Sequence, residues 1–102
     1  MVIDAKTLES TINETNEKFV ITDKPVMESV MEVLPILNKN GKITIKGKGE
    51  SCPATVSVAN IITQNMLNSK TKTEQILLGS ESDNDGRLIS TIEIVITKIS
   101  SQ

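Results

Sequence analysis

Residues 42–49 read KITIKGKG and decide how the rest of the chain is organised. The apolar residues Ile43 and Ile45 alternate with polar ones, and a period of two is typical of a β-strand with one buried face. The side chains of the lysines in this strand therefore point away from the buried face. Gly47 and Gly49 allow the backbone to turn sharply afterwards. The stretch predicts a half-buried strand that ends in a tight turn.

The segment before this strand is typical of an amphipathic helix. Asp23 is a candidate cap and Pro25 fits the first turn. Residues 38–41, NKNG, are expected to end the helix, and Pro35 predicts a kink or an earlier end because proline removes a backbone hydrogen bond. One face carries apolar side chains at helical spacing: Val26, Val30, Val33, Leu34 and Leu37, widened by Met27 and Met31.

A second helix is predicted after the strand and extends to about residue 68. Ser51 is its candidate N-cap, and Pro53 stands in its first turn. Its apolar stripe consists of Val58, Ala59, Ile62 and Met66, with Ile61 beside it. Both stripes must be buried against a sheet or against another helix.

Three further strands complete the predicted order. Residues 19–21, 73–79 and 88–99 are rich in strand-forming side chains, and the sequence DNDG at 83–86 is typical of a hairpin turn. The order β-α-β-α-β-β predicts an α/β fold, more closely an α+β two-layer sandwich. Its four-stranded mixed sheet would carry both helices on one face.

In this interpretation residues 19–99 form one domain, and residues 1–18 form a tail or a marginal helix. The first crossover is expected to join parallel strands, and the last two strands are expected to be antiparallel.

The composition excludes several classes of function. The 102 residues contain no histidine and one cysteine, so Ser-His or Cys-His catalysis and zinc sites of Cys and His are absent. The only aromatic residue is Phe19, which excludes a base-stacking platform. No signal peptide or membrane span is predicted. A cytoplasmic protein that is not an enzyme and holds no metal or cofactor is expected.

The net charge of −2 gives no sign of a polyanionic partner, so any such partner must meet a local patch. Lys39, Lys42, Lys46 and Lys48 lie within ten residues that contain no acid. Lys46 and Lys48 are expected to project near the start of the second helix, where free N–H groups favour a phosphate. The alternative is a solvated strand face, and the cluster alone leaves both open.

Two other groups of residues are better explained by a structural role than by metal binding or catalysis. Glu81, Asp83, Asp85 and Gly86 copy the first half of a calcium loop, but its twelfth position is Ile92 instead of glutamate. Cys52 stands near a helix start without a histidine to act as base, so a packing role is predicted.

Three segments together resemble the Alba family of small archaeal chromatin and RNA-binding proteins. They are residues 24–27 (KPVM), residues 43–49 (ITIKGKG), and residues 85–87 (DGR) followed by residues 90–94 (STIEI). Their order and spacing cover about residues 19–98.

The resemblance implies the same fold, a homodimer, and binding of DNA or RNA backbone without reading of sequence. In that family the loop that opens the first helix, the segment after the second strand and the last hairpin contact nucleic acid. These positions in this chain are Lys24, Lys46, Lys48, Gly49 and Arg87, to which the lysine cluster adds Lys42. A cytoplasmic or chromosome-associated location is expected, without a membrane partner.

Several positions depart from the family pattern. Asp23, Glu50 and Ala54 stand where basic residues are usual, and the hairpin is acidic. They support an alternative, in which the chain is a protein-interaction or assembly module. Such a module would be a heterodimer partner of a basic Alba paralogue, with weak or lost binding of nucleic acid.

Overall fold

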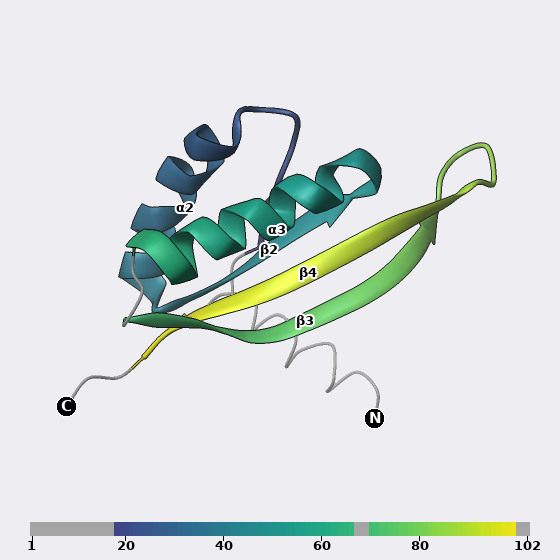
Figure 1. The fold of residues 1–102 in the computed structure, drawn as a ribbon. Helices are drawn as coiled ribbons and strands as arrows, with labels where there is room; N and C mark the ends of the chain where they lie inside the picture. The colour runs from purple at the N-terminus through teal and green to yellow at the C-terminus, as the bar shows by residue number, and fades with distance from the viewer. Residues whose placement is uncertain (1–17, 67–69, 100–102) are drawn as a thin grey trace, which may run out of the picture.

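The computed structural model describes residues 18–66 and 70–99, with the side chains of residues 65 and 66 excepted. Its elements follow the predicted order (Figure 1). They are β1 (Lys18–Val20), α2 (Val26–Asn40), β2 (Lys42–Lys48), the short helix η1 (Gly49–Ser51), α3 (Cys52–Asn60), η2 (Ile61–Met66), β3 (Thr71–Ser82) and β4 (Leu88–Lys98). The expected tail at residues 1–18 lies outside the described residues, except Lys18, which begins β1.

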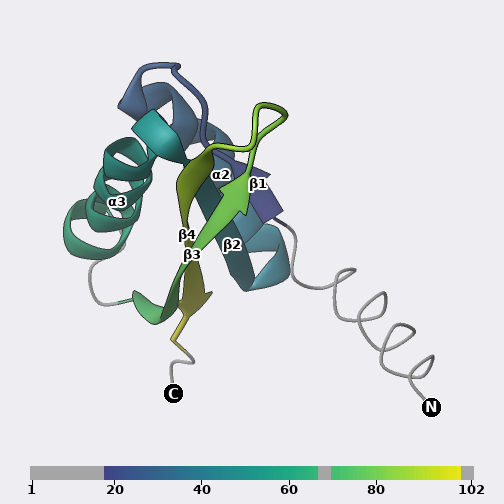
Figure 2. The same ribbon diagram turned by 90° about the vertical axis from the view of Figure 1, so that its right-hand side faces the viewer.

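The four strands form one mixed sheet in the order β1-β2-β4-β3. β1 is parallel to β2, and β4 is antiparallel to both β2 and β3. Both helices lie on one face of the sheet (Figure 1), and β1 and β3 are its edge strands. Figure 2 shows α3 and β1 toward opposite sides of the view. The structure therefore confirms the predicted fold.

The core lies between the helices and one face of the central strands. Ile43 and Ile45 of β2 pair with Ile96 and Ile94 of β4, and all four side chains are buried. The helices cover them with Val30, Val33 and Leu37 of α2, with Val58 and Ala59 of α3, and with Ile62 of η2. Burial of each large aliphatic side chain contributes about 1.5–3 kcal/mol. The predicted stripes are thus confirmed for these residues, whereas the side chain of Met66 is not described.

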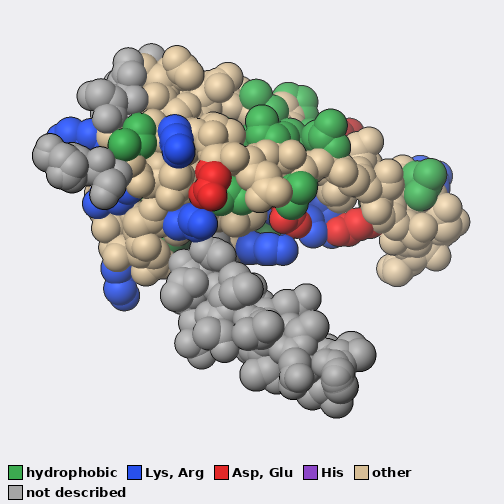
Figure 3. Space-filling model, turned by 90° about the horizontal axis from the view of Figure 1, so that it is seen from below, with side chains coloured by type: hydrophobic (Ala, Val, Ile, Leu, Met, Phe, Trp, Pro, Cys, Tyr) green, Lys and Arg blue, Asp and Glu red, His purple; other side chains and the backbone are tan. Residues whose placement is uncertain are grey.

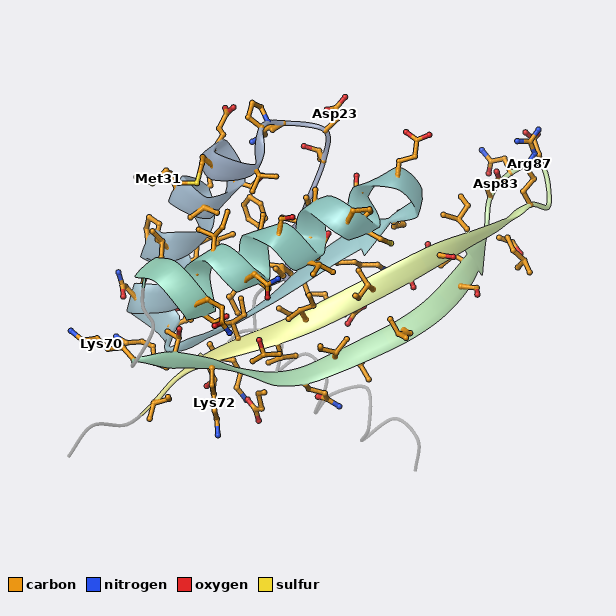
Figure 4. All side chains as sticks on the ribbon, in the orientation of Figure 1. Asp23, Met31, Lys70, Lys72, Asp83 and Arg87 are labelled. Atoms are coloured by element: carbon orange, nitrogen blue, oxygen red, sulfur yellow. The ribbon has the colours of Figure 1, made fainter. Side chains whose placement is uncertain are left out.

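The structure differs from three expectations for α2, namely an early end at Pro35, a cap by the side chain of Asp23, and burial of Met27 and Met31. The helix continues through Pro35 to Asn40 and ends at Gly41, whose φ is 80°; Pro35 is exposed, so water can satisfy the carbonyl that loses its partner. Pro25 occupies the N-cap position, and no side chain caps the helix. Met27 and Met31 are 48% and 58% exposed. Figure 4 shows Met31 on the outer side of α2.

α3 approaches β2 closely at a glycine. A Cβ built on Gly47 would overlap Oγ1 of Thr55 and would lie 2.8 Å from the carbonyl oxygen of Ser51. Thr55 is fully buried, and its Oγ1 donates a 2.8 Å hydrogen bond to that same carbonyl. Ser51 is the N-cap residue, as predicted, but makes no side-chain cap bond. After Asn60 the helix continues with wider, π-type turns to Met66, and residues 67–69 lie outside the described residues.

β3 is longer than the strand predicted at residues 73–79. β4 has nearly the bounds predicted, residues 88–99. They form a hairpin that extends beyond the helices (Figure 1). A bulge between Thr73 and Gln75 shifts the register within β3. The connection between the strands, residues 83–87, contains the predicted turn at 83–86, and Gly86 has a φ of 83°.

We expect Gly47→Ala to lower the free energy of unfolding by about 1–3 kcal/mol, because the added methyl group overpacks the contact between β2 and α3. Chemical denaturation measures the change. Gly79→Ala is the matched control. Gly79 lies on the exposed edge strand β3, and a Cβ at this position would lie 3.1 Å from Oγ1 of Thr91. Equal stability of Gly47→Ala and wild type would contradict the close approach.

Candidate nucleic-acid interface

The face of the sheet opposite the helices carries most of the predicted basic residues. Because Ile45 and Gly47 point toward the helices, Lys46 and Lys48 point the other way. We call this the charged face; it includes Lys18, Lys42, Lys46, Lys48, Glu81 and Glu93. Lys48 directly precedes η1 and α3, as expected, but strand alternation points the side chains of Lys46 and Lys48 to the face opposite α3.

Strand direction gathers most of the predicted site at one end of the sheet. β1, β2 and β3 end there and β4 begins there, so Lys24, Lys48 and Arg87 share this end. We call it the hairpin end, formed by residues 21–25, 46–50 and 81–88. Figure 4 places Arg87 and Asp83 at its tip and Asp23 in the loop before α2.

Lys42 does not belong to this group. It begins β2, whereas Lys48 ends it, and six residues of strand separate them by about 20 Å. Lys39 lies in the last turn of α2, three residues before Lys42 begins β2. The lysine cluster of the sequence is thus divided between the two ends of the sheet.

Acidic side chains neutralise the lysines of the hairpin end. Nζ of Lys46 lies 2.9 Å from Oε2 of Glu81 and 3.9 Å from Oε2 of Glu93. Nζ of Lys48 lies 3.4 Å from Oε1 of Glu81, and Nζ of Lys18 lies 3.4 Å from Oε2 of Glu93. One carboxylate, Glu81, thus bridges two predicted contact residues. Figure 3 shows acidic and basic side chains side by side on this face.

Lys24 is paired in the same way. Its ammonium group donates to both carboxylate oxygens of Glu32 at 2.8 Å. This bond ties the loop before α2 to the second turn of the helix. The pairing of Glu32, Glu81 and Glu93 with these lysines was not predicted from the sequence, because the partners lie 8 to 75 residues apart along the chain.

Backbone geometry explains the remaining predicted positions. Gly49 has a φ of 55°, a conformation that favours glycine where β2 turns into η1. The carboxylate of Asp83 accepts 2.9 Å hydrogen bonds from the backbone N–H groups of Asp85 and Arg87. Asp83 therefore shapes the turn that presents the exposed Arg87.

Cys52 and the acidic turn have structural roles. Sγ of Cys52 donates to the carbonyl oxygens of Gly47 and Ser90 at 3.7 and 3.6 Å, which links α3 to two strands. In the described ranges, no group of three or more Cys, Asp or Glu side chains could hold a metal ion. No helix in the same ranges is long and apolar enough to cross a membrane.

Comparison with known proteins identifies the family. A family model described as Alba matches residues 16–80. The chain belongs to the Alba family. A relative named DNA/RNA-binding protein Alba, from Nitrosopumilus maritimus strain SCM1, is 35% identical over 89 residues, covering 83% of this chain and 94% of the relative.

Solved structures agree with this assignment. Alba from Thermoplasma volcanium has a TM-score of 0.71 and 30% identity, and the match covers 79% of this chain and 99% of that chain. ALBA1 from Trypanosoma brucei has a TM-score of 0.68 at 15% identity, over 81% of this chain and 69% of that chain, and shows likeness of fold alone. The resemblance stated from three short segments is therefore confirmed over most of the chain.

The ion pairs of this Alba chain alter its titration. The hydrogen bond to Glu81 raises the pKa of Lys46, against partial desolvation. Hydrogen bonds from Lys46, which has the larger effect, and from Lys48 lower the pKa of Glu81. The hydrogen bond to Glu32 likewise raises the pKa of Lys24. Lys24 and Lys46 therefore stay charged at neutral pH, with their charge compensated locally.

The lowered pKa of Glu81 predicts a specific acid response. Its ion pairs stabilise the fold above about pH 4.3, the ordinary glutamate value, and this contribution is lost as the pH falls through the lower folded pKa. In NMR titration of the side-chain carboxyl carbon, we expect the Glu81 midpoint below the ordinary value in wild type and closer to it in Lys46→Gln. Lys42→Gln is the control and should leave the midpoint unchanged. An unshifted wild-type midpoint would refute the bridge.

Proposed function

We propose that this Alba chain binds the sugar-phosphate backbone of DNA or RNA without reading the base sequence. The binding surface is the hairpin end, with Lys24, Lys46, Lys48, Gly49 and Arg87. The main support is that the chain shares 35% identity with a relative named DNA/RNA-binding protein Alba. The convergence of these residues at one end of the sheet adds to it.

The ion pairs set the conditions under which this surface binds. A phosphate must take Lys46 and Lys48 from Glu81, and Lys24 from Glu32. Exposed ion pairs are weak, so a polyanion with several phosphates can replace them. Binding should be weak and sensitive to salt, since each phosphate that a lysine neutralises adds about 0.9 to the salt slope on duplex DNA.

One observation favours a second function. The segments of the hairpin end that hold four basic residues also hold five acids: Asp23, Glu50, Glu81, Asp83 and Asp85. A surface compensated in this way suits a protein-interaction module, such as a heterodimer partner of a basic Alba paralogue. Binding of nucleic acid would then depend on the partner.

Amide NMR titration with a short DNA or RNA duplex separates these functions. For backbone binding, the amide signals of Gly49 and Arg87 shift on titration at low salt, and Lys46→Glu with Lys48→Glu removes those shifts. Glu81→Gln releases both lysines and should lower the dissociation constant at these residues about five-fold.

Asp85→Asn is the matched control for Glu81→Gln. It removes the same charge from the hairpin, but no ion pair of the described residues involves Asp85. We therefore expect a smaller effect from it. Absence of any shift at Gly49 and Arg87, in wild type and in Glu81→Gln, would exclude backbone binding here and leave the interaction module.

We further propose that the chain acts as a dimer through the outer part of β3. This edge strand continues the helix-side face of the sheet beyond the helices, with Ile76 and Leu78 opposite the buried Ile94 and Ile92. Ile76, Leu78 and Leu88 are 55%, 80% and 76% exposed. A long edge strand with such side chains favours pairing with a second copy.

Leu78→Lys tests the dimer. In a monomer the new lysine side chain is exposed to water and changes the stability of the fold little. In a dimer the same side chain places a charge in the interface. We expect sedimentation velocity to show a dimer for wild type and a monomer for Leu78→Lys. Met31→Lys, on the exposed side of α2, is the control and should remain a dimer. A wild-type monomer, or a dimeric Leu78→Lys, would contradict the proposal.

A further inference from the structure

The end of the sheet opposite the hairpin turn gathers five lysines from four elements. Lys39 lies in the last turn of α2, Lys42 begins β2, and Lys98 ends β4. Lys70 and Lys72 lie at the start of β3, and Figure 4 shows them at the far end of the sheet from Arg87. We call this the lysine end, formed by residues 39–42, 70–74 and 97–99.

Backbone contacts hold these segments together. Lys42 and Lys72 both pair with Thr97, on either side of β4, so their side chains share the charged face about 10 Å apart. The N–H of Lys98 donates to the carbonyl of Gly41 at 2.9 Å, and the N–H of Ile99 donates to the carbonyl of Lys70 at 2.8 Å. The lysines are therefore fixed at one edge of the molecule by regular strand pairing.

Charge compensation at this end is slight. The lysine end has one acid, Glu74, whose Oε1 lies 3.3 Å from Nζ of Lys42. Within residues 18–66 and 70–99, no ion pair involves Lys39, Lys70, Lys72 or Lys98. At the hairpin end, by contrast, Lys24, Lys46 and Lys48 are all paired.

Part of the cluster has a structural role. Lys39 lies in the last turn of α2, and Nζ of Lys98 lies 3.5 Å from the carbonyl oxygen of Asn38, so both favour the negative end of the helix dipole. Lys70 and Lys72 do not contribute to this capping. Both are exposed and precede the bulge that follows Thr73. Their positive potential is directed to solvent.

We propose that the lysine end is a second surface for the sugar-phosphate backbone of nucleic acid, distinct from the hairpin end. This inference rests on the proposed function in so far as the chain binds nucleic acid at all. A duplex carries one phosphate charge per about 1.7 Å of its axis, so Lys42 and Lys72, about 10 Å apart, can contact different phosphates of one duplex. Because fewer ion pairs must break, this surface binds more tightly at low salt than the hairpin end.

The same amide NMR titration with a short duplex resolves the two surfaces separately. We expect the signals of Lys70, Lys72 and Lys98 to shift at lower duplex concentration than those of Gly49 and Arg87. Lys70→Glu with Lys72→Glu should abolish the shifts at the lysine end and preserve those at the hairpin end. Lys46→Glu with Lys48→Glu changes the charge by the same amount and should do the reverse. Retained signal dispersion shows that each variant is folded.

Each result decides one of the two sites. Shifts confined to the hairpin end would overturn the second surface and leave the proposed function intact. Shifts confined to the lysine end would support the second surface and exclude the first. No shift at either end would exclude both. A response of the lysine end to vesicles of acidic phospholipid, without a response to duplex, would also overturn this proposal, because the ligand would then be a lipid surface.

Discussion

The pairing of β2 with β4 is the constraint on which the rest of the structure depends. Its register sets Ile45 opposite Ile94 on the helix side and Lys46 opposite Glu93 on the other side. A slip of one residue would turn lysines toward α2 and α3 and isoleucines toward the charged face. The same register therefore fixes both the hydrophobic core and the ion pairs. Core burial strongly favours this pairing, and the charges follow from it.

This dependence explains why the predicted basic site is compensated. Side chains on the charged face of β2 meet those of β4 and, across β4, those of β3, where Glu93 and Glu81 stand. The pairing that buries the isoleucines thus brings carboxylates to Lys46 and Lys48. Such pairs lie at the surface, so they reduce the local potential without closing the site to a ligand. At the lysine end, where β2 and β3 begin and β4 ends, the described segments supply one acid, Glu74.

Local patterns sufficed to predict the elements, their order and the fold class. Alternation at Ile43 and Ile45, the stripe on α2 and the turn at residues 83–86 each depend on neighbouring residues. The missing information was long-range. No local signal gives the sheet order or the partner of Lys46, which is 35 residues away in the sequence. Pro35 and Met31 were misjudged for a related reason: the side of α2 that faces solvent depends on where the sheet lies.

The separation of Lys42 from Lys48, by contrast, follows from strand geometry alone, since a strand of seven residues is about 20 Å long. The same geometry limits what net charge can reveal. β3 has 12 residues and spans about 40 Å, whereas screening at physiological salt reduces interactions beyond about 8 Å. A polyanion at one end of the sheet therefore senses little of the charge at the other end. A net charge of −2 is compatible with one end that is nearly neutral or acidic and another that is strongly basic. For a protein built on long strands, the distribution of charge along the strands decides which polyanion can bind and where.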